Sequence, residues 1–82
     1  MKLTYDPRHN VAYMRLREPT TSVESLRISD ELLIDIAPDG SVYGLEFLNA
    51  NEQLRSADGG DLVFVDPIHG TKHSFPLPPA AE

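Results

Sequence analysis

The sequence predicts a β-rich α+β fold: hairpins build a single antiparallel sheet, joined by one short helix and an extra C-terminal hairpin. Three observations predict it. Apolar and polar residues alternate with period two in several short runs, as they do in half-buried strands. Asp-Pro and Asp-Gly pairs, which favour turns, interrupt these runs. Only the segment NANEQLRS begins in the manner of a helix.

The first predicted hairpin runs from Met1 to Leu16, and its loop is residues 7–10, PRHN. Asp before Pro suits the start of a turn, Pro fixes φ, and Asn10 tolerates the left-handed conformation. A four-residue loop places six mostly apolar side chains on one face in three facing pairs: Tyr5 with Ala12, Leu3 with Met14, and Met1 with Leu16.

A connector at residues 18–22 leads to a third predicted strand, Val23 to Ile28. Its apolar residues do not alternate cleanly, so we expect either a bulge near Ser25 or a short edge strand. Ser29 and Asp30 then turn the chain into the next hairpin.

The central hairpin, residues 31–48, consists of two alternating runs that meet at Asp39-Gly40. Asp-Gly favours a type I′ turn, in which both central residues have positive φ. A two-residue loop gathers the apolar residues on one face in the pairs Ile36–Tyr43, Ile34–Leu45 and Leu32–Phe47. A three-residue loop, 38–40, would shift the register by one and spoil this face, so we reject it. A four-residue loop, 37–40, keeps the parity and remains open.

Residues 49–56 predict one or two helical turns that pack across the sheet. Asn49 is the predicted N-cap, and Glu52, three residues later, would complete a capping box. Residues 56–61 form a loop before the last hairpin.

The last hairpin, residues 62–75, repeats the first, because VDPIHG and YDPRHN share Asp-Pro-x-His followed by Gly or Asn. Residues 67–70 are the predicted loop, with Gly70 in the left-handed conformation. Leu62 then faces Phe75, and Phe64 faces His73. We expect a single domain over residues 1–75, followed by a frayed, Pro-rich tail at 76–82.

Size and composition restrict the function. A chain of 82 residues buries only roughly 60–65% of its unfolded surface, so oligomerisation would help to stabilise it. The sequence has no Cys, which removes disulfides and thiolate metal ligands, and its net charge of −6 disfavours binding to nucleic acid. No apolar run is long enough to span a membrane, and Met1 leads straight into a strand pattern. We expect a cytoplasmic protein.

Candidate chemistry is confined to the two Asp-Pro-x-His loops. A small hydrolytic or metal-dependent enzyme, the alternative function, would use Asp6, His9, Asp66, His69 or His73. Asp before Pro usually bonds the backbone of its own turn. The His69/His73 spacing chelates zinc on a helix, but Pro67 and Gly70 oppose a helix there. We therefore predict no catalytic residue, no cofactor-binding residue, no metal ligand and no cofactor.

The second strand of the first hairpin carries the one candidate interaction surface, Tyr13, Arg15 and Arg17. Aromatic and basic side chains on a strand can bind single-stranded nucleic acid. Three residues against the net charge of −6 make a protein partner the better prediction.

Two stretches, YDPRHNVAYMRL and ISDELLIDIAPDGSVYGLEFLNA, together resemble a widespread family of small bacterial proteins known as domain of unknown function 2283. The matching positions are Tyr5, Asp6, Pro7, Tyr13, Leu16, Ser29, Asp30, Asp39, Gly40, Gly44, Leu45, Glu46, Phe47 and Leu48. Glu31 departs from the pattern, because the family often has Gly there. The resemblance covers roughly the first fifty residues. It implies a compact β-rich fold with a small helix and no established reaction, and some relatives look like partners of small toxin-like proteins.

The combined prediction is a sheet of about five to seven strands with one apolar face. That face is built from Leu3, Met14, Leu16, Ile34, Leu45 and Phe47. One short helix covers such a face poorly, so either the last hairpin or a second protomer folds over it. We expect a non-enzymatic protein-interaction module, homodimeric or bound to a protein partner, with a small toxin-like protein as one candidate. We expect no membrane or nucleic-acid partner.

Overall fold

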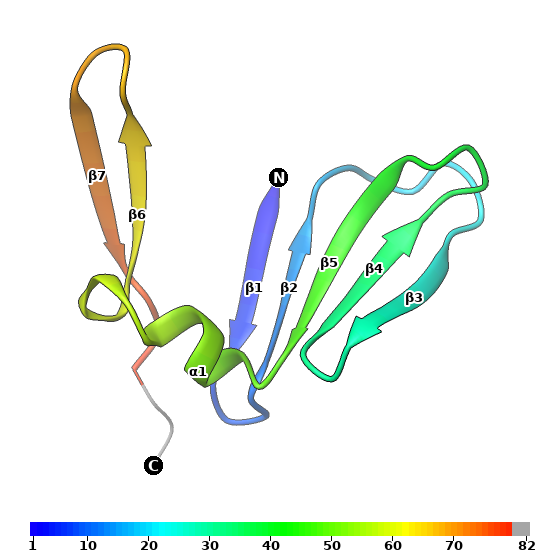
Figure 1. Cartoon of the computed structure of the whole chain (residues 1–82), viewed down its shortest axis with the longest axis horizontal. Helices are drawn as coiled ribbons and strands as arrows, with labels where there is room; N and C mark the ends of the chain where they lie inside the picture. The colour runs from blue at the N-terminus through cyan, green and yellow to red at the C-terminus, as the bar shows by residue number, and fades with distance from the viewer. Residues whose placement is uncertain (80–82) are drawn as a thin grey trace.

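The computed structural model describes residues 1–79, which form a five-stranded antiparallel sheet, a short helix and a separate two-stranded hairpin (Figure 1). The elements are β1 (Lys2–Asp6), β2 (Val11–Arg15), β3 (Glu24–Ser29), β4 (Leu32–Ile36), β5 (Val42–Leu48), α1 (Ala50–Arg55), the 3-10 turn η1 (Asp58–Gly60), β6 (Asp61–Asp66) and β7 (Thr71–Pro76). The strand order in the larger sheet is β1-β2-β5-β4-β3. The predicted β-rich α+β fold built from hairpins is confirmed.

The two Asp-Pro-x-His hairpins form as predicted. Tyr5 faces Ala12 across β1 and β2, and Leu62 faces Phe75 across β6 and β7. The predicted left-handed residues have positive φ, 58° at Asn10 and 67° at Gly70. Both loops span four residues, because a local Asp-Pro turn sets the loop length and the loop length sets the register.

The central hairpin keeps the predicted pairing of Ile34 with Leu45 but reaches it by a different turn. The type I′ prediction is wrong, because Gly40 has positive φ and Asp39 does not. The Ala37 carbonyl accepts from the Gly40 amide, and the Ala37 amide donates to the Ser41 carbonyl, both at 2.9 Å. These bonds close the three-residue loop, 38–40. The alternation of apolar residues argued against this loop, because it shifts the register by one residue.

A bulge restores the parity that this loop removes. Ile36 faces Val42 rather than Tyr43, whereas Asp35 faces Gly44. Tyr43 is therefore an extra residue on β5, without a partner on β4. The one-residue shift of the loop and the one-residue shift of the bulge cancel, so the apolar residues still share a face.

The third strand also differs from its prediction. It begins at Glu24 and ends at Ser29, one residue later at each end than expected. The bulge lies between Arg27 and Ser29, whereas Ser25 pairs regularly with Asp35. β3 is an edge strand, as the alternative prediction had it.

The helix forms where predicted, but its capping box does not. Asn49 adopts the left-handed conformation (φ 54°, ψ 41°) and makes no side-chain cap hydrogen bond. The helix is capped from the first hairpin instead: the Ala50 amide donates to the Asn10 carbonyl at 3.1 Å. The Asn51 amide donates to Asn10 Oδ1 at 2.8 Å. A residue distant in sequence therefore satisfies the helix N-terminus.

We call the hairpin β6–β7, residues 61–76, the arm. It stands beside the sheet rather than over it (Figure 1), so it does not provide the cover that one of the two predictions required. The predicted tail begins within β7, at Pro76, and its last three residues lie outside the described residues. No helix in residues 1–79 is long and apolar enough to cross a membrane.

Candidate interaction surfaces

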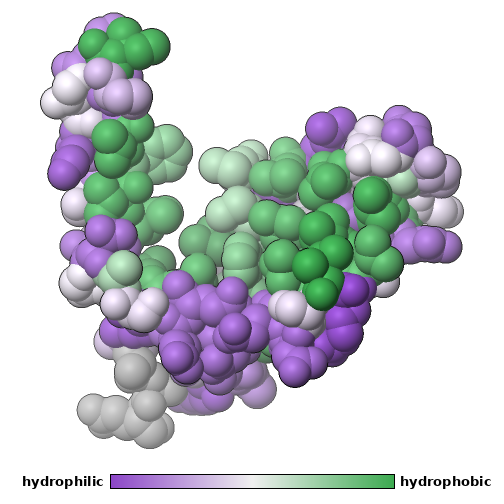
Figure 2. Space-filling view, viewed as in Figure 1, coloured by the Kyte–Doolittle hydropathy of each residue, from purple (hydrophilic) through white to green (hydrophobic). Residues whose placement is uncertain are grey.

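One face of the five-stranded sheet is apolar from edge to edge. Successive register pairs join one residue from each strand into a row, Leu3–Met14–Leu45–Ile34–Leu26. Five of the six residues predicted for the apolar face are strand residues, and the register places them there; Leu16 lies just beyond β2. Figure 2 shows apolar residues gathered over the sheet.

Within residues 1–79, only one end of this face has a cover. The helix packs there, with Ala50 fully buried and Ala12 nearly so. The Tyr5 hydroxyl donates to Asn51 Oδ1 at 2.6 Å, and Asn51 Nδ2 donates to the Pro7 carbonyl at 3.0 Å. These bonds fix α1 to the first hairpin and leave the central row uncovered.

The described residues enclose almost no core. The buried apolar residues are three alanines, Ala12, Ala37 and Ala50, and no large side chain in residues 1–79 is fully buried. The accessible surface is 5966 Å². A compact monomer of 9.1 kDa exposes about 4,900 Å², so this chain exposes roughly 1,100 Å² more. The radius of gyration is 14.4 Å, against about 12 Å for a compact domain of this length.

The opposite face of the sheet is polar and internally bonded. The Tyr13 hydroxyl donates to Asp35 Oδ2 at 2.6 Å, and the Ser25 hydroxyl donates to Asp35 Oδ1 at 2.7 Å. The hydrogen bond to the Asp35 carboxylate, with some desolvation, raises the pKa of Tyr13 to about 12. Asp35 is therefore a structural acceptor that joins β2, β4 and β3.

The residues predicted as an interaction surface each have a contact within the chain. Arg15 lies on the polar face with Tyr13 and forms an ion pair with Glu18, N–O distance 3.0 Å. Arg17 lies beyond the end of β2, and its guanidinium carbon is 5.2 Å from the centre of the Tyr43 ring. Each of the three side chains has a partner within the chain, and their role in binding stays a prediction.

The two Asp-Pro-x-His turns form equivalent Asp–His pairs. Asp6 Oδ2 lies 2.6 Å from His9 Nδ1, and Asp66 Oδ2 lies 2.6 Å from His69 Nδ1. Each Asp also accepts two backbone amides of its own turn. The pKa of each carboxyl lies below its ordinary value of 3.8, and the hydrogen bond to the histidine side chain is the largest cause.

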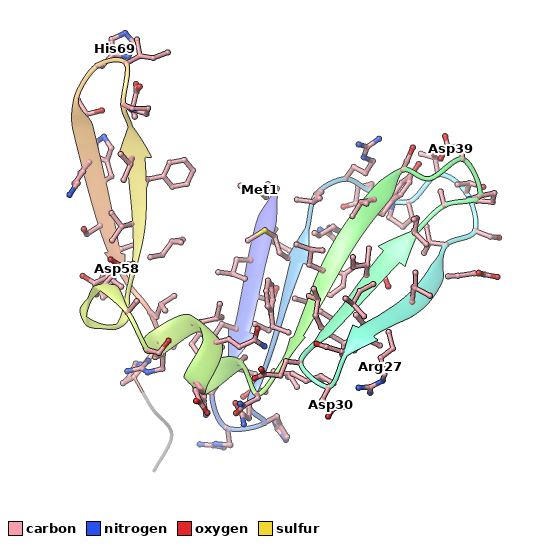
Figure 3. The ribbon with its side chains drawn as sticks, in the orientation of Figure 1. Met1, Arg27, Asp30, Asp39, Asp58 and His69 are labelled. Carbon is pink, nitrogen blue, oxygen red and sulfur yellow. The ribbon has the colours of Figure 1, made fainter. Side chains whose placement is uncertain are left out.

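The two pairs do not come together. Figure 3 shows His69 at the far tip of the arm, whereas the Asp6–His9 turn lies beside the helix. His73 lies on β7 opposite Phe64. In the part of the chain that the structure describes, no three His, Asp or Glu residues are grouped so that they could hold a metal ion.

Ile68 is an exposed apolar residue that the sequence patterns did not single out. It occupies the position of Arg8 in the equivalent first turn, and its side chain is 87% exposed at the tip of the arm. The signal was available in the sequence, because an apolar residue replaces a charged one within an otherwise repeated turn.

Comparison with known proteins finds a family for about the first three-fifths of the chain. Neither the search of curated proteins nor the search of solved structures found a match. A family described as "Protein of unknown function (DUF2283)" matches residues 2–51, which extend from β1 into α1 and include both Asn10 and Asn51. The arm lies outside the matched segment. Because the match covers more than half of the 82 residues, the chain belongs to the DUF2283 family.

Proposed function

We propose that this protein is a non-enzymatic protein-interaction module that associates through the apolar face of its five-stranded sheet, and that its first partner is a second copy of itself. The observation that carries the proposal is the uncovered row Leu3–Met14–Leu45–Ile34–Leu26. A sheet with one apolar face requires a second layer, and α1 covers only one end.

The exposed area supports a dimer in particular. The excess surface of roughly 1,100 Å² over a compact monomer exceeds the roughly 800 Å² that each partner buries in a standard interface. An isologous pair buries the same patch on both copies and closes on itself. One dimerisation event would therefore remove most of this excess surface from each chain.

The polar face would remain accessible in such a dimer. Tyr13 and Arg15 lie on it, and a further protein partner, such as a small toxin-like protein, would bind there. The family resemblance motivates that partner. A cytoplasmic location, which the lack of Cys permits, belongs to the same proposal.

The alternative function is a hydrolytic or metal-dependent enzyme that uses the Asp–His pairs. The observation in its favour is the short Asp–His distance of 2.6 Å in both turns. Each carboxylate also accepts backbone amides of its own turn. These bonds give each Asp a structural role in its turn, which accounts for its position without catalysis.

Sedimentation equilibrium of two neighbouring Leu variants tests the proposal. Leu26 lies in the apolar row and is 52% exposed. Leu26→Glu therefore places a charge on the proposed interface without burying that charge inside the monomer. Leu33→Glu is the matched control, because Leu33 faces Arg27 and Glu46 on the polar side. We expect Leu26→Glu to raise the dimer dissociation constant by at least tenfold, which is about 1.4 kcal/mol, and Leu33→Glu to leave it nearly unchanged. Equal effects would contradict the proposal.

A further inference from the structure

We propose that the arm of one copy packs across the apolar sheet face of a second copy, so that two copies clasp each other reciprocally. This inference rests on the proposed homodimer and names the segment that fills its interface. Five of the nine large apolar side chains that are exposed in residues 1–79 lie on the arm: Leu62, Phe64, Val65, Ile68 and Phe75. The chain therefore has two exposed apolar surfaces, the sheet face and the arm, and each can bury the other when two copies meet.

The arm has one strongly apolar face of its own. The register places Leu62 opposite Phe75 and Phe64 beside them, opposite His73. Phe64 is 54% exposed and Phe75 is 52% exposed. A two-stranded hairpin is marginally stable by itself in water, so the arm requires a surface to pack against. Figure 2 shows apolar residues along the arm and open space between the arm and the sheet.

The tip of the arm supports a contact beyond the chain. The turns at Asp6 and Asp66 have the same hydrogen bonds, so turn formation does not require an apolar residue at the second position. The first turn has Arg8 there and the arm has Ile68. Ile68 thus adds an 87% exposed apolar side chain to the end of the arm, where packing against a second copy would bury it.

The base of the arm directs it away from its own sheet. Asp58, Gly59 and Gly60 all have positive φ, 53°, 65° and 81°. Beyond β7, Arg55 of α1 donates to the Pro78 carbonyl, which holds both ends of the arm near the helix. Figure 3 shows Asp58 at this base. Packing against a second copy leaves this backbone as the structure has it.

The dimensions of the two surfaces correspond. Each strand of the arm has six residues, about 20 Å at 3.3 Å per residue. Five strands spaced about 4.8 Å apart extend about 19 Å from one edge strand to the other. The arm can therefore cross the whole row from Leu3 to Leu26. Because each copy has one arm and one face, a twofold arrangement satisfies both and leaves no end for polymer growth.

Crosslinking of single-cysteine chains tests the clasp, and the natural lack of Cys removes background reactions. One chain carries Phe64→Cys on the arm, and an isotope-labelled chain carries Ile34→Cys in the row. The two are mixed and treated with a short, flexible thiol-to-thiol reagent. We expect a crosslink between labelled and unlabelled chains. Val65→Cys replaces Phe64→Cys in the control, because Val65 is equally exposed, at 54%, but lies on the other face of the arm. We expect it to crosslink at least tenfold less.

Dimer affinity gives the second measurement. We expect Phe64→Asp to weaken dimerisation of the full chain by tenfold or more, and Val65→Asp to weaken it by less than threefold. A wild-type protein that dimerises while both variants behave alike would overturn the clasp and leave the proposed homodimer standing. A wild-type protein that is monomeric at every concentration would overturn the homodimer, and the clasp with it. In a third sample, each chain carries both Phe64→Cys and Ile34→Cys; a crosslink that forms within such a chain, with none between the labelled and unlabelled single-cysteine chains, would show the arm covering its own sheet and would also overturn the clasp.

Discussion

The Tyr13 side chain lies directly against Gly44 on the neighbouring strand. A Cβ at Gly44 would come within 2.2 Å of the Tyr13 hydroxyl oxygen and 2.6 Å of the ring carbon that bears it. Gly44 is the residue that allows the phenol to cross β5 and reach Asp35 on β4. Gly44 is therefore required by the close packing of Tyr13 and not by a turn.

Gly44→Ala should destabilise the fold by about 1–3 kcal/mol, because Tyr13 must move and its hydrogen bond to Asp35 is lost. Chemical denaturation of the variant measures this cost. In a Tyr13→Ala background the same substitution has no ring to displace, so its cost should be smaller, with the 3.2 Å approach to the Met14 carbonyl oxygen remaining. A cost that is unchanged in that background would contradict the steric explanation.

The phenol of Tyr13 should titrate later than an ordinary tyrosine. Its folded pKa of about 12 exceeds the ordinary value of 10.0, chiefly because the neutral phenol donates to Asp35. A group whose pKa is raised by folding stabilises the fold below its unfolded pKa. The stability contributed by Tyr13 should therefore be intact below pH 10 and be lost as pH rises from about 10 to 12.

Phenolate absorbance during alkaline titration measures this shift. Asp35→Asn is the control, since it removes the charged acceptor and should bring the pKa of Tyr13 back toward 10.0. A pKa of wild-type Tyr13 near 10.0 would contradict the hydrogen bond.

The two Asp-Pro-x-His turns should respond to acid in the same way. The histidine hydrogen bonds lower the pKa of Asp6 and of Asp66 below 3.8, so each carboxylate stabilises its turn at neutral pH. That contribution should persist down to about pH 3.8 and disappear as pH falls through the lowered pKa of each group. Carboxyl chemical shifts in an NMR titration follow the two residues separately.

His9→Ala provides an internal control for these turns. It removes the largest cause of the Asp6 shift and should raise the pKa of Asp6 toward 3.8, while the pKa of Asp66 stays lowered. If both carboxyls moved together, the assignment of each shift to its own histidine would fail.

Asn10 should stabilise the helix from outside it. Asn10→Gly keeps the positive φ of 58° but removes the oxygen that accepts the Asn51 amide, and it should cost about 1 kcal/mol of unfolding free energy. Asn49→Gly is the control, because Asn49 also has positive φ and makes no cap bond; its exposed side-chain bonds are to the side chains of Asn10, Glu31 and Glu52. We expect a smaller loss there, and thermal unfolding compares the two. An equal loss would show that Asn10 is not the cap.

The parts of the fold that sequence predicted are those fixed by local chemistry. The turns at Pro7–Asn10 and Pro67–Gly70 follow from Asp-Pro and from one left-handed residue each, so loop length and register could be derived together. The central turn could not, because a rejected loop and an unforeseen bulge at Tyr43 offset each other. The alternation of apolar residues reports only the combined register shift of loop and bulge, so it cannot separate the two.

Tertiary contacts decided what sequence could not. The capping box failed because Asn49 adopts the left-handed conformation and Asn10, 41 residues before Asn51, supplies the acceptor. The position of the arm depends on backbone angles at Asp58 to Gly60, which no period of apolar residues encodes. The apolar face was predictable from the alternation of apolar and polar residues alone. The segment that covers this face was not predictable in the same way, and the proposed clasp supplies one.

Light scattering of the wild-type chain during size-exclusion chromatography tests the central claim, that the apolar face belongs to an interface between two copies. Above the dissociation constant, the molar mass should be twice 9.1 kDa, and it should fall toward 9.1 kDa on dilution. A mass of 9.1 kDa at every concentration would contradict the account.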